Sequence, residues 1–186
     1  MLTFQQPGQA DQTINKSRFF ARARRCENER ELALFLRQFA SEHQGAGHLA
    51  YAFRMHTVDG IVARFSDAGE PAGTAGKPIM QMLDGQNYVN CCVAVIRYYG
   101  GINLGTGGLV RAYGGTAKMA MELAGSIPFI EMVQLTITTT YKRVDELTRE
   151  VQKANGEVLD KHFDEAAHFL LKLPLDAAQQ LQRKFA

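Results

Sequence analysis

Apolar residues in the first half of the chain recur with either helical or strand-like spacing. Residues 29–43 carry apolar side chains at positions i, i+3, i+4 and i+7, which predicts an amphipathic helix that packs on a sheet. Asn28 precedes this segment and is suited to cap the helix. Residues 50–58 and 61–65 have the pattern of two strands, and the intervening Asp59-Gly60 favours a hairpin turn. Residues 1–15 are polar and irregular, so we expect an extended lead-in there.

The central stretch of the chain, residues 93–115, changes its character twice. Residues 93–96 are apolar and mostly β-branched, which predicts a buried strand. Five glycines follow between residues 100 and 108, and a helical pattern begins at Leu109. The unpaired N–H groups and the dipole at the start of that helix suit an anion, which Arg97 and Arg111 are also expected to reach. The alternative is a tight structural turn that needs glycine for its backbone conformation.

A second loop, residues 66–78, combines glycines with charged and hydroxyl side chains, and a short helix is expected over residues 79–83. Asp67 and Glu70 are candidates for a carboxylate pair, a metal site or an arginine clamp. Their candidate partners are Arg64, Arg97 and Arg111. The alternative is that Asp67 caps a turn, as aspartate does readily.

Residues 126–186 form a predicted second domain after a first domain of residues 1–125. Alternation in residues 130–139, a helical stripe in residues 143–155, two further strands and a final helix give the order β-α-β-β-α. This is the order of a ferredoxin-like fold without its last strand. We therefore expect either a three-stranded sheet with an exposed edge or a chain whose true C-terminus lies further on.

Composition and charge narrow the choice of protein class. Hydrophobic residues make up 46% and charged residues 22%, as in ordinary globular proteins, and the net charge of +2 does not by itself imply a nucleic-acid binder. No apolar run is long enough for a membrane span and no secretory signal is present, so we expect a cytoplasmic protein with no membrane partner. The three cysteines do not form a disulfide framework, and we expect reduced core thiols.

One strand is unusually basic. Residues 16–25 contain five basic residues and no acidic one, and alternation places Arg22 and Arg24 on the face opposite Ala21 and Ala23. Such a strand either contacts phosphates or forms an ordinary solvated face.

Four motifs resemble the YigZ/IMPACT family, in matching order along residues 16–124. They are residues 16–19 (KSRF), His48 with Tyr51 three positions on, residues 66–78 (SDAGEPAGTAGKP) and residues 97–114 (RYYGGINLGTGGLVRAYG). The resemblance implies an α+β protein with a first domain like domain 2 of ribosomal protein S5. It also implies a ferredoxin-like second domain similar to the last domain of elongation factor G. Eukaryotic members of this family regulate translation initiation by competing for a partner of a kinase, whereas the bacterial members have no agreed reaction.

These observations favour a non-catalytic binding protein linked to translation, with RNA, a ribosome, a translation factor or an acidic protein as its possible partner. We expect the two glycine-rich loops to form one surface, on which arginines contact an anion or acidic partner, glycines allow close approach, and Asp67 and Glu70 orient the arginines. No catalytic residue, metal ligand or cofactor is assigned. The candidate binding residues are His48, Arg64, Ser66, Asp67, Glu70, Thr74, Lys77, Arg97, Tyr98, Gly100, Gly101, Gly105, Thr106, Gly107, Gly108 and Arg111.

Two other functions stay open. The first is an enzyme or sensor for a small phosphorylated ligand, because the glycine-rich loop before a helix is similar in layout to the phosphate loop of GHMP kinases. In that case Asp67 or Glu70 would hold Mg²⁺ or act as a base. The loop lacks the serine pair of those kinases and the Gly-Lys-Ser/Thr ending of a Walker A motif. The second is a protein–protein adaptor whose loops are simply a rigid surface.

Overall fold

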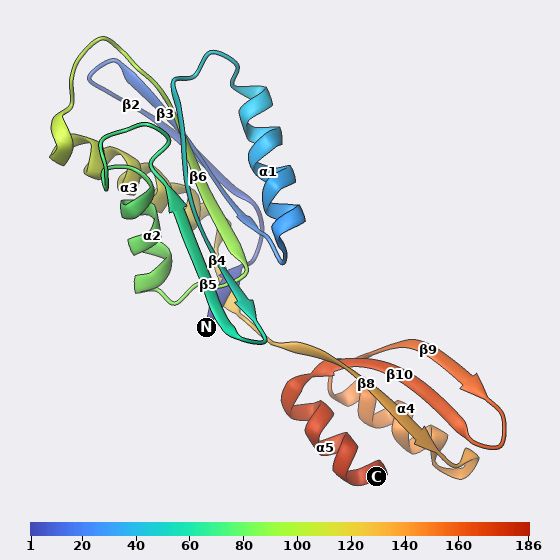
Figure 1. Cartoon of the computed structure of the whole chain (residues 1–186). Coiled ribbons are helices and arrows are strands. Elements are labelled where there is room, and N and C mark those ends of the chain that lie inside the picture. The colour runs from blue at the N-terminus through green and yellow to red at the C-terminus, as the bar shows by residue number, and fades with distance from the viewer. The chain divides into compact units, whose positions relative to one another are not determined.

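The computed structural model describes residues 1–186 and divides into two compact units, Met1–Phe129 and Ile130–Ala186. Helices and antiparallel sheets alternate irregularly along the chain (Figure 1), which confirms the predicted α+β class. No helix combines the length and the apolar character that a bilayer crossing requires. Each unit has its own hydrophobic core and is described separately.

The first unit is built on a five-stranded sheet with the order β2-β3-β6-β4-β5, in which all neighbours are antiparallel. The central strand β6 is buried along almost its entire length because both faces of the sheet are covered there. The elements of this unit are β1 (Leu2–Phe4), β2 (Gly8–Ile14), β3 (Ser17–Arg25), α1 (Glu29–Glu42), β4 (His48–Thr57), β5 (Gly60–Ser66), α2 (Gly76–Gly85), β6 (Cys91–Tyr98), α3 (Gly105–Ala124) and β7 (Ser126–Pro128).

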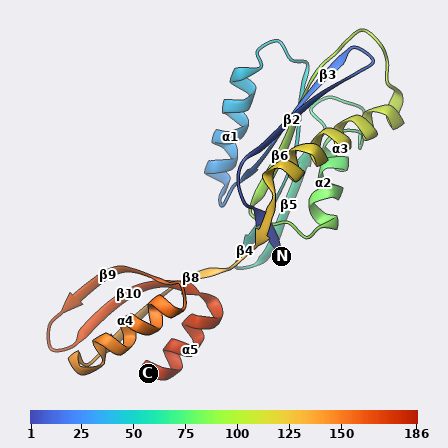
Figure 2. The same cartoon turned by 180° about the vertical axis from the view of Figure 1, so that it is seen from behind.

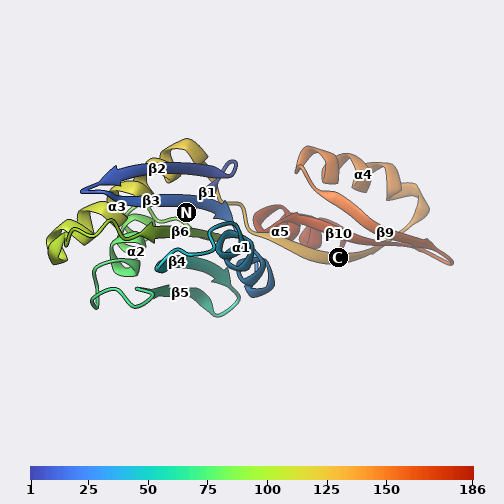
Figure 3. The same cartoon turned by 90° about the horizontal axis from the view of Figure 1, so that it is seen from above.

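Helices cover the two faces of the sheet unequally. Helices α2 and α3 lie on one face, and α1 alone lies on the other (Figures 2 and 3). Phe19 and Val95 are buried under α2 and α3, whereas Phe20 and Ile96 face α1. This alternation follows from the two-residue repeat of a strand. It also confirms that Arg22 and Arg24 lie opposite Ala21 and Ala23.

Two helix starts show how local sequence signals compare with the structure. The side chain of Asn28 accepts a hydrogen bond of 2.9 Å from the backbone N–H of Glu31, so the predicted cap of α1 is confirmed. Helix α3, by contrast, begins at Gly105 rather than at Leu109. The glycines before Leu109 are weak helix formers, but the packing of the following turns on the sheet outweighs that preference.

The expected irregular lead-in is wrong, because it forms β1 and β2. Strand β2 pairs with β3 along its full length and rests on α3. Its inward residues are Gly8, Ala10, Gln12 and Ile14, and a Cβ atom at Gly8 would lie 2.1 Å from the carbonyl oxygen of Ala120. Only Ile14 among these inward residues is large and apolar, so the strand pattern is weak in the sequence.

The boundary between the units lies after Phe129 rather than after Gly125. Residues 126–128 form β7, which pairs with β1 at the opposite end of the first unit's sequence. Their backbone hydrogen bonds therefore tie them to the first unit.

The second unit has the order β-α-β-β-α that alternation predicts. Its three-stranded sheet has the order β8-β10-β9, so β8 and β9 are the edges, and both α-helices contribute to the buried core. Asn155 adopts a positive φ of 52° just after the helix, which fits the predicted stop. The elements are β8 (Met132–Thr139), the 3₁₀ turn η1 (Tyr141–Arg143), α4 (Val144–Lys153), β9 (Glu157–Phe163), β10 (Ala167–Pro174) and α5 (Leu175–Phe185).

Candidate functional site

Both glycine-rich loops reach the same end of the five-stranded sheet. We call residues 67–75, between β5 and α2, the first loop, and residues 99–104, between β6 and α3, the second loop. Arg97 pairs with His48 on one side and with Phe19 on the other, so the end of β6 lies beside the starts of β3 and β4. The β2–β3 turn therefore meets the two loops at this end (Figure 1).

A buried ion pair joins the two loops. The guanidinium Nη1 of Arg97 donates to both carboxylate oxygens of Glu70, at 2.9 and 3.1 Å. Their side chains are 6% and 4% exposed. Removing two charges from water is costly, so such a pair persists where each charge is matched by the other. Glu70 thus orients Arg97, as predicted, but Arg97 is inside the protein rather than on its surface.

Three further side chains complete what we call the buried cluster, which comprises Ser17, His48, Glu70, Arg97 and Tyr113. The hydroxyl of Tyr113 donates to Glu70 Oε1 at 2.7 Å, and burial together with this bond raises the pKa of Tyr113 far above its usual value. Ser17 Oγ accepts from Arg97 Nη2 at 3.4 Å and from the backbone N–H of Gly100 at 3.2 Å. Neither Tyr113 nor Ser17 is among the residues predicted for the site.

His48 lies at the partly exposed margin of this cluster. Its Nδ1 is 2.7 Å from the carbonyl oxygen of Ala68, and because a carbonyl only accepts, Nδ1 must carry the proton. Its Nε2 lies 3.9 Å from Glu70 Oε1. The imidazole therefore holds the start of the first loop and lies beside Glu70.

Asp67 organises the first loop from within. Its carboxylate accepts backbone N–H groups of Gly73, Ala75 and Gly76 at 2.8–3.0 Å. Partial burial alone would raise the pKa of Asp67, but these hydrogen bonds outweigh burial and lower it below its usual value. Two of the donors lie at the start of α2, which has no side-chain cap of its own. Asp67 thus caps a turn and a helix, the simpler of the predicted alternatives, and it orients no arginine.

The remaining polar groups of the first loop are also bonded within the loop. Thr74 Oγ1 donates to the carbonyl of Pro71 at 2.6 Å, and Ser66 Oγ accepts from the N–H of Ala68 at 3.2 Å. Gly76 allows a close approach, because a Cβ atom there would lie 2.4 Å from the carbonyl oxygen of Ser66. Lys77 is exposed beside this loop.

The second loop is more open. Gly100 packs against the β2–β3 turn, where a Cβ atom would lie 2.1 Å from the backbone carbonyl carbon of Lys16. Gly101 and Gly105 have φ values of +84° and +68°, which favour glycine, yet no atom lies within 4 Å of a Cβ placed on either. Asn103 Oδ1 accepts the N–H of Gly105 at 2.9 Å, and the N–H groups of Thr106 and Gly107 have no acceptor within α3.

Arg111 lies just inside α3 with its guanidinium exposed. It forms no ion pair, and Nη1 would be 3.5 Å from a Cβ atom at Gly107. It lines a cavity of about 330 Å³ between α3 and β2, together with Gln12, Asn15, Leu104 and Gly108. At this cavity the guanidinium of Arg111 and the first turn of α3 lie beside the amides of Gln12 and Asn15, of which Gln12 already donates to Thr116 Oγ1 at 2.6 Å.

Two predicted site residues lie elsewhere. Arg64 forms an ion pair with Glu29 at the start of α1, at 3.1 Å, and is therefore not a partner of the loop carboxylates. The hydroxyl of Tyr98 lies 3.0 Å from Nδ1 of His43, on the α1 face of the sheet. Since neighbouring strand residues point to opposite faces, Tyr98 cannot share the site of Arg97.

The site can be summarised by group. The buried cluster contains His48, Glu70 and Arg97, and the first loop holds Ser66, Asp67 and Thr74 in internal hydrogen bonds. The outer part, which we call the loop surface, consists of the exposed Lys16, Lys77, Gly101, Gly105, Thr106, Gly107 and Arg111 and of the half-buried Gly108. No three His, Cys, Asp or Glu side chains are grouped to hold a metal ion. The oxygens of Asp67 and Glu70 are already engaged by donors.

Comparison with known proteins places this arrangement in a family. The Impact N-terminal domain model matches residues 15–121, which include both loops and the buried cluster. The chain is 35% identical to an IMPACT family member of Haemophilus influenzae over 162 residues, 87% of this chain and 79% of that protein. It is 33% identical to the IMPACT family member YigZ of Escherichia coli over 167 residues, 89% of this chain and 81% of that protein.

A solved structure agrees with the sequence relatives. The crystal structure of a hypothetical protein superposes with a TM-score of 0.74 and 29% identity, and covers 98% of this chain and 89% of that one. The fold and the site thus define a two-unit α+β protein with an Impact N-terminal domain. The chain belongs to the IMPACT family.

Proposed function

We propose that this protein is a non-catalytic, cytoplasmic regulatory protein that binds an anionic partner of the translation apparatus, either RNA or the surface of a ribosome or translation factor. The observation that carries the proposal is the loop surface, with the exposed guanidinium of Arg111 beside the unpaired N–H groups at the start of α3. Family membership supports the link to translation, because the resemblance to eukaryotic IMPACT proteins implies a regulatory role there.

The buried cluster supports this function indirectly. The Arg97–Glu70 pair and the hydroxyl of Tyr113 hold the first loop, the end of β6 and α3 in fixed relative positions. A rigid surface loses little conformational entropy on binding. In this proposal Arg97 positions the surface, and Arg111 contacts the partner.

Catalysis is disfavoured by how the candidate acid–base groups are used. The carboxylate of Asp67 accepts three backbone N–H groups, and that of Glu70 accepts from Arg97 and Tyr113. A general base needs a free lone pair aimed at the substrate.

A second candidate function is recognition of a small phosphorylated ligand, and the cavity beside Arg111 favours it. Its volume of about 330 Å³ suits a small ligand, and its lining brings the guanidinium of Arg111 and the amide of Asn15 to the first turn of α3.

The two functions are separated by co-sedimentation of the full chain with ribosomes across a salt series. Arg111→Gln is the test variant, and Arg37→Gln, an exposed residue on the outer side of α1, is the matched control. Salt-sensitive pelleting that is weakened in Arg111→Gln alone supports the translation partner. Absence of pelleting at low salt refutes it, and a thermal shift with nucleotides or sugar phosphates then supports the second candidate.

A further inference from the structure

A groove runs along the other face of the sheet, where α1 leaves β2 and β3 uncovered. Three adjoining cavities of about 360, 340 and 450 Å³ follow one another between α1 and these strands, and consecutive cavities share Arg22 or Arg24 in their lining. We call this feature the arginine groove. It lies on the face opposite the buried cluster and does not depend on the function proposed for the loop surface.

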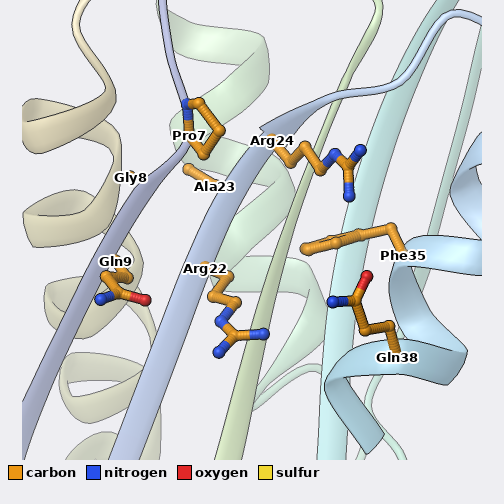
Figure 4. A pocket seen from close by; sticks show the side chains of 8 residues that line it. All are labelled: Pro7, Gly8, Gln9, Arg22, Ala23, Arg24, Phe35 and Gln38. Carbon is orange, nitrogen blue, oxygen red and sulfur yellow. The ribbon is translucent and has the colours of Figure 1, made fainter.

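Strand β3 places three arginines along the groove, and Asp11 of β2 is the acidic residue in the lining of the 360 Å³ cavity. Arg18, Arg22 and Arg24 project from one face of β3, and Figure 4 shows the last two reaching toward Phe35 and Gln38 of α1. Arg22 forms an ion pair with Glu42 on the rim. Neither Arg18 nor Arg24 has an acidic partner within ion-pair distance, and both are exposed. Two of the three guanidinium groups are therefore free to bind an anion.

Aromatic rings alternate with these arginines. Phe20, Phe39 and His43 line the 360 Å³ cavity, and Phe35 lines the 340 Å³ cavity. Phe35 and Phe39 are buried in the core between α1 and the sheet, whereas Phe20 and His43 are partly exposed. The guanidinium of Arg18 lies 4.8 Å from the centre of the Phe20 ring, and that of Arg22 lies 4.7 Å from the centre of the Phe39 ring. Guanidinium groups held against rings offer flat surfaces on which bases stack, and their N–H groups still face outward.

The combination of an elongated groove, unpaired arginines and aromatic rings is characteristic of sites that hold single-stranded nucleic acid. We propose that the arginine groove binds single-stranded RNA. Arg18 and Arg24 contact phosphates, and Phe20 and His43 provide the stacking surface. An acidic peptide would satisfy the arginines but would leave the aromatic rings unused.

The 450 Å³ cavity at the Arg25 end of the groove limits the length of the RNA site. There Arg25 pairs with Glu27 at 2.8 Å, and Glu31 bonds to the backbone N–H of Glu27. The charges at this end are balanced, so the RNA occupies the part between Arg18 and Arg24.

The test is fluorescence anisotropy of a short labelled oligouridine with the full chain, across a salt series. An Arg18→Gln/Arg24→Gln double variant is compared with Arg30→Gln/Arg37→Gln, which removes the same charge from exposed positions of α1 outside the groove lining. The groove variant is expected to bind at least about tenfold more weakly and to lower the salt slope by about 1.4, since each lost phosphate contact removes about 0.7.

A third variant changes the affinity in the opposite direction, so that loss of folding cannot imitate it. Glu42→Gln removes a negative charge from the rim and frees Arg22, and about two- to threefold tighter binding is expected.

Three results would overturn the proposal. They are no RNA binding at low salt, equal binding by the groove and control variants, or arginine-dependent binding of oligoglutamate in place of RNA. The last result would assign the groove to an acidic protein segment.

Discussion

The two glycine-rich loops lie at the same end of the sheet but have different physical roles. In the first loop, Asp67 accepts three backbone N–H groups and Glu70 receives Arg97 and Tyr113, so nearly every strong polar group is bonded within the protein. In the second loop, Gly101 with its positive φ leads to a helix start at which the N–H groups of Thr106 and Gly107 have no intrahelical acceptor, beside the exposed Arg111.

The first loop therefore stabilises the fold, whereas the second loop has polar groups that can contact a partner. A loop whose charges are buried and paired is rigid, and its residues matter for stability. A loop with free donors on a fixed base has groups left for a partner. Loss of a group in the first loop should therefore weaken the fold, and loss of Arg111 should weaken binding only.

The largest effect is expected for Arg97→Ala. This substitution leaves the carboxylate of Glu70 buried without its cation, so the first unit should lose about 3–5 kcal/mol of unfolding free energy. Urea denaturation followed by circular dichroism measures this loss. The control is the Arg97→Met/Glu70→Leu double variant, which removes both charges and should restore part of the stability, since the hydroxyl of Tyr113 still loses its acceptor. A loss below about 1 kcal/mol for the single variant would contradict the assigned role of the pair.

The next largest loss of stability is expected at Gly100 of the second loop, and it should exceed the loss at the neighbouring Gly101. Gly100→Ala should cost about 3 kcal/mol, because the new Cβ atom overlaps the backbone of Lys16. Gly101→Ala meets no neighbouring atom and should cost about 1–2 kcal/mol from its positive φ alone. The melting temperatures of the two variants, measured by thermal unfolding, give the order of the two losses. Equal losses would mean that the turn at Lys16 moves aside freely.

Asp67→Asn tests the internal bonding of the first loop. It should cost about 2 kcal/mol at neutral pH, because hydrogen bonds to a charged acceptor are stronger than those to an amide. The folded protein lowers the pKa of Asp67, so the contribution of this carboxylate is complete above the unfolded-state pKa and is lost as pH falls through the folded-state value.

The stability difference between the wild type and Asp67→Asn should accordingly shrink on acidification. Denaturation at several pH values below neutrality measures it. A difference that stays constant down to strongly acidic pH would show that the charge of Asp67 does not stabilise the loop.

The smallest effect on stability is expected for Arg111→Gln. Its side chain is exposed and forms no ion pair, so the unfolding free energy should change by less than about 0.5 kcal/mol. Ribosome pelleting should nevertheless weaken in the same sample. A large loss of stability would show that Arg111 stabilises the fold, as the residues of the first loop do. The contrast between the two loops would then not hold.

The sequence by itself determined features that depend on neighbouring residues. Helical spacing and Asn28 predicted α1, Asp59-Gly60 predicted the β4–β5 hairpin, and the order of elements in the second unit was also read correctly. The loop motifs identified the family. Each of these signals lies within a short segment, where periodicity and turn chemistry act directly.

Tertiary structure decided which polar groups meet. Glu70 bonds to Arg97 and Tyr113, which lie 27 and 43 positions away, and Ser17 reaches Arg97 across 80 positions. From the sequence alone, Arg64, Arg97 and Arg111 were all candidate partners for the carboxylates of the first loop. Strand register buried one of them, and packing left Arg111 on the surface.

The exposure of the arginine groove was also decided by tertiary structure. The sequence predicts which face of β3 carries the arginines, but whether that face is covered depends on where α1 lies across the sheet. Helix α1 leaves β2 and the outer face of β3 open. Local patterns specify the elements, whereas long-range packing determines which of their charged groups are buried and which stay available to a partner.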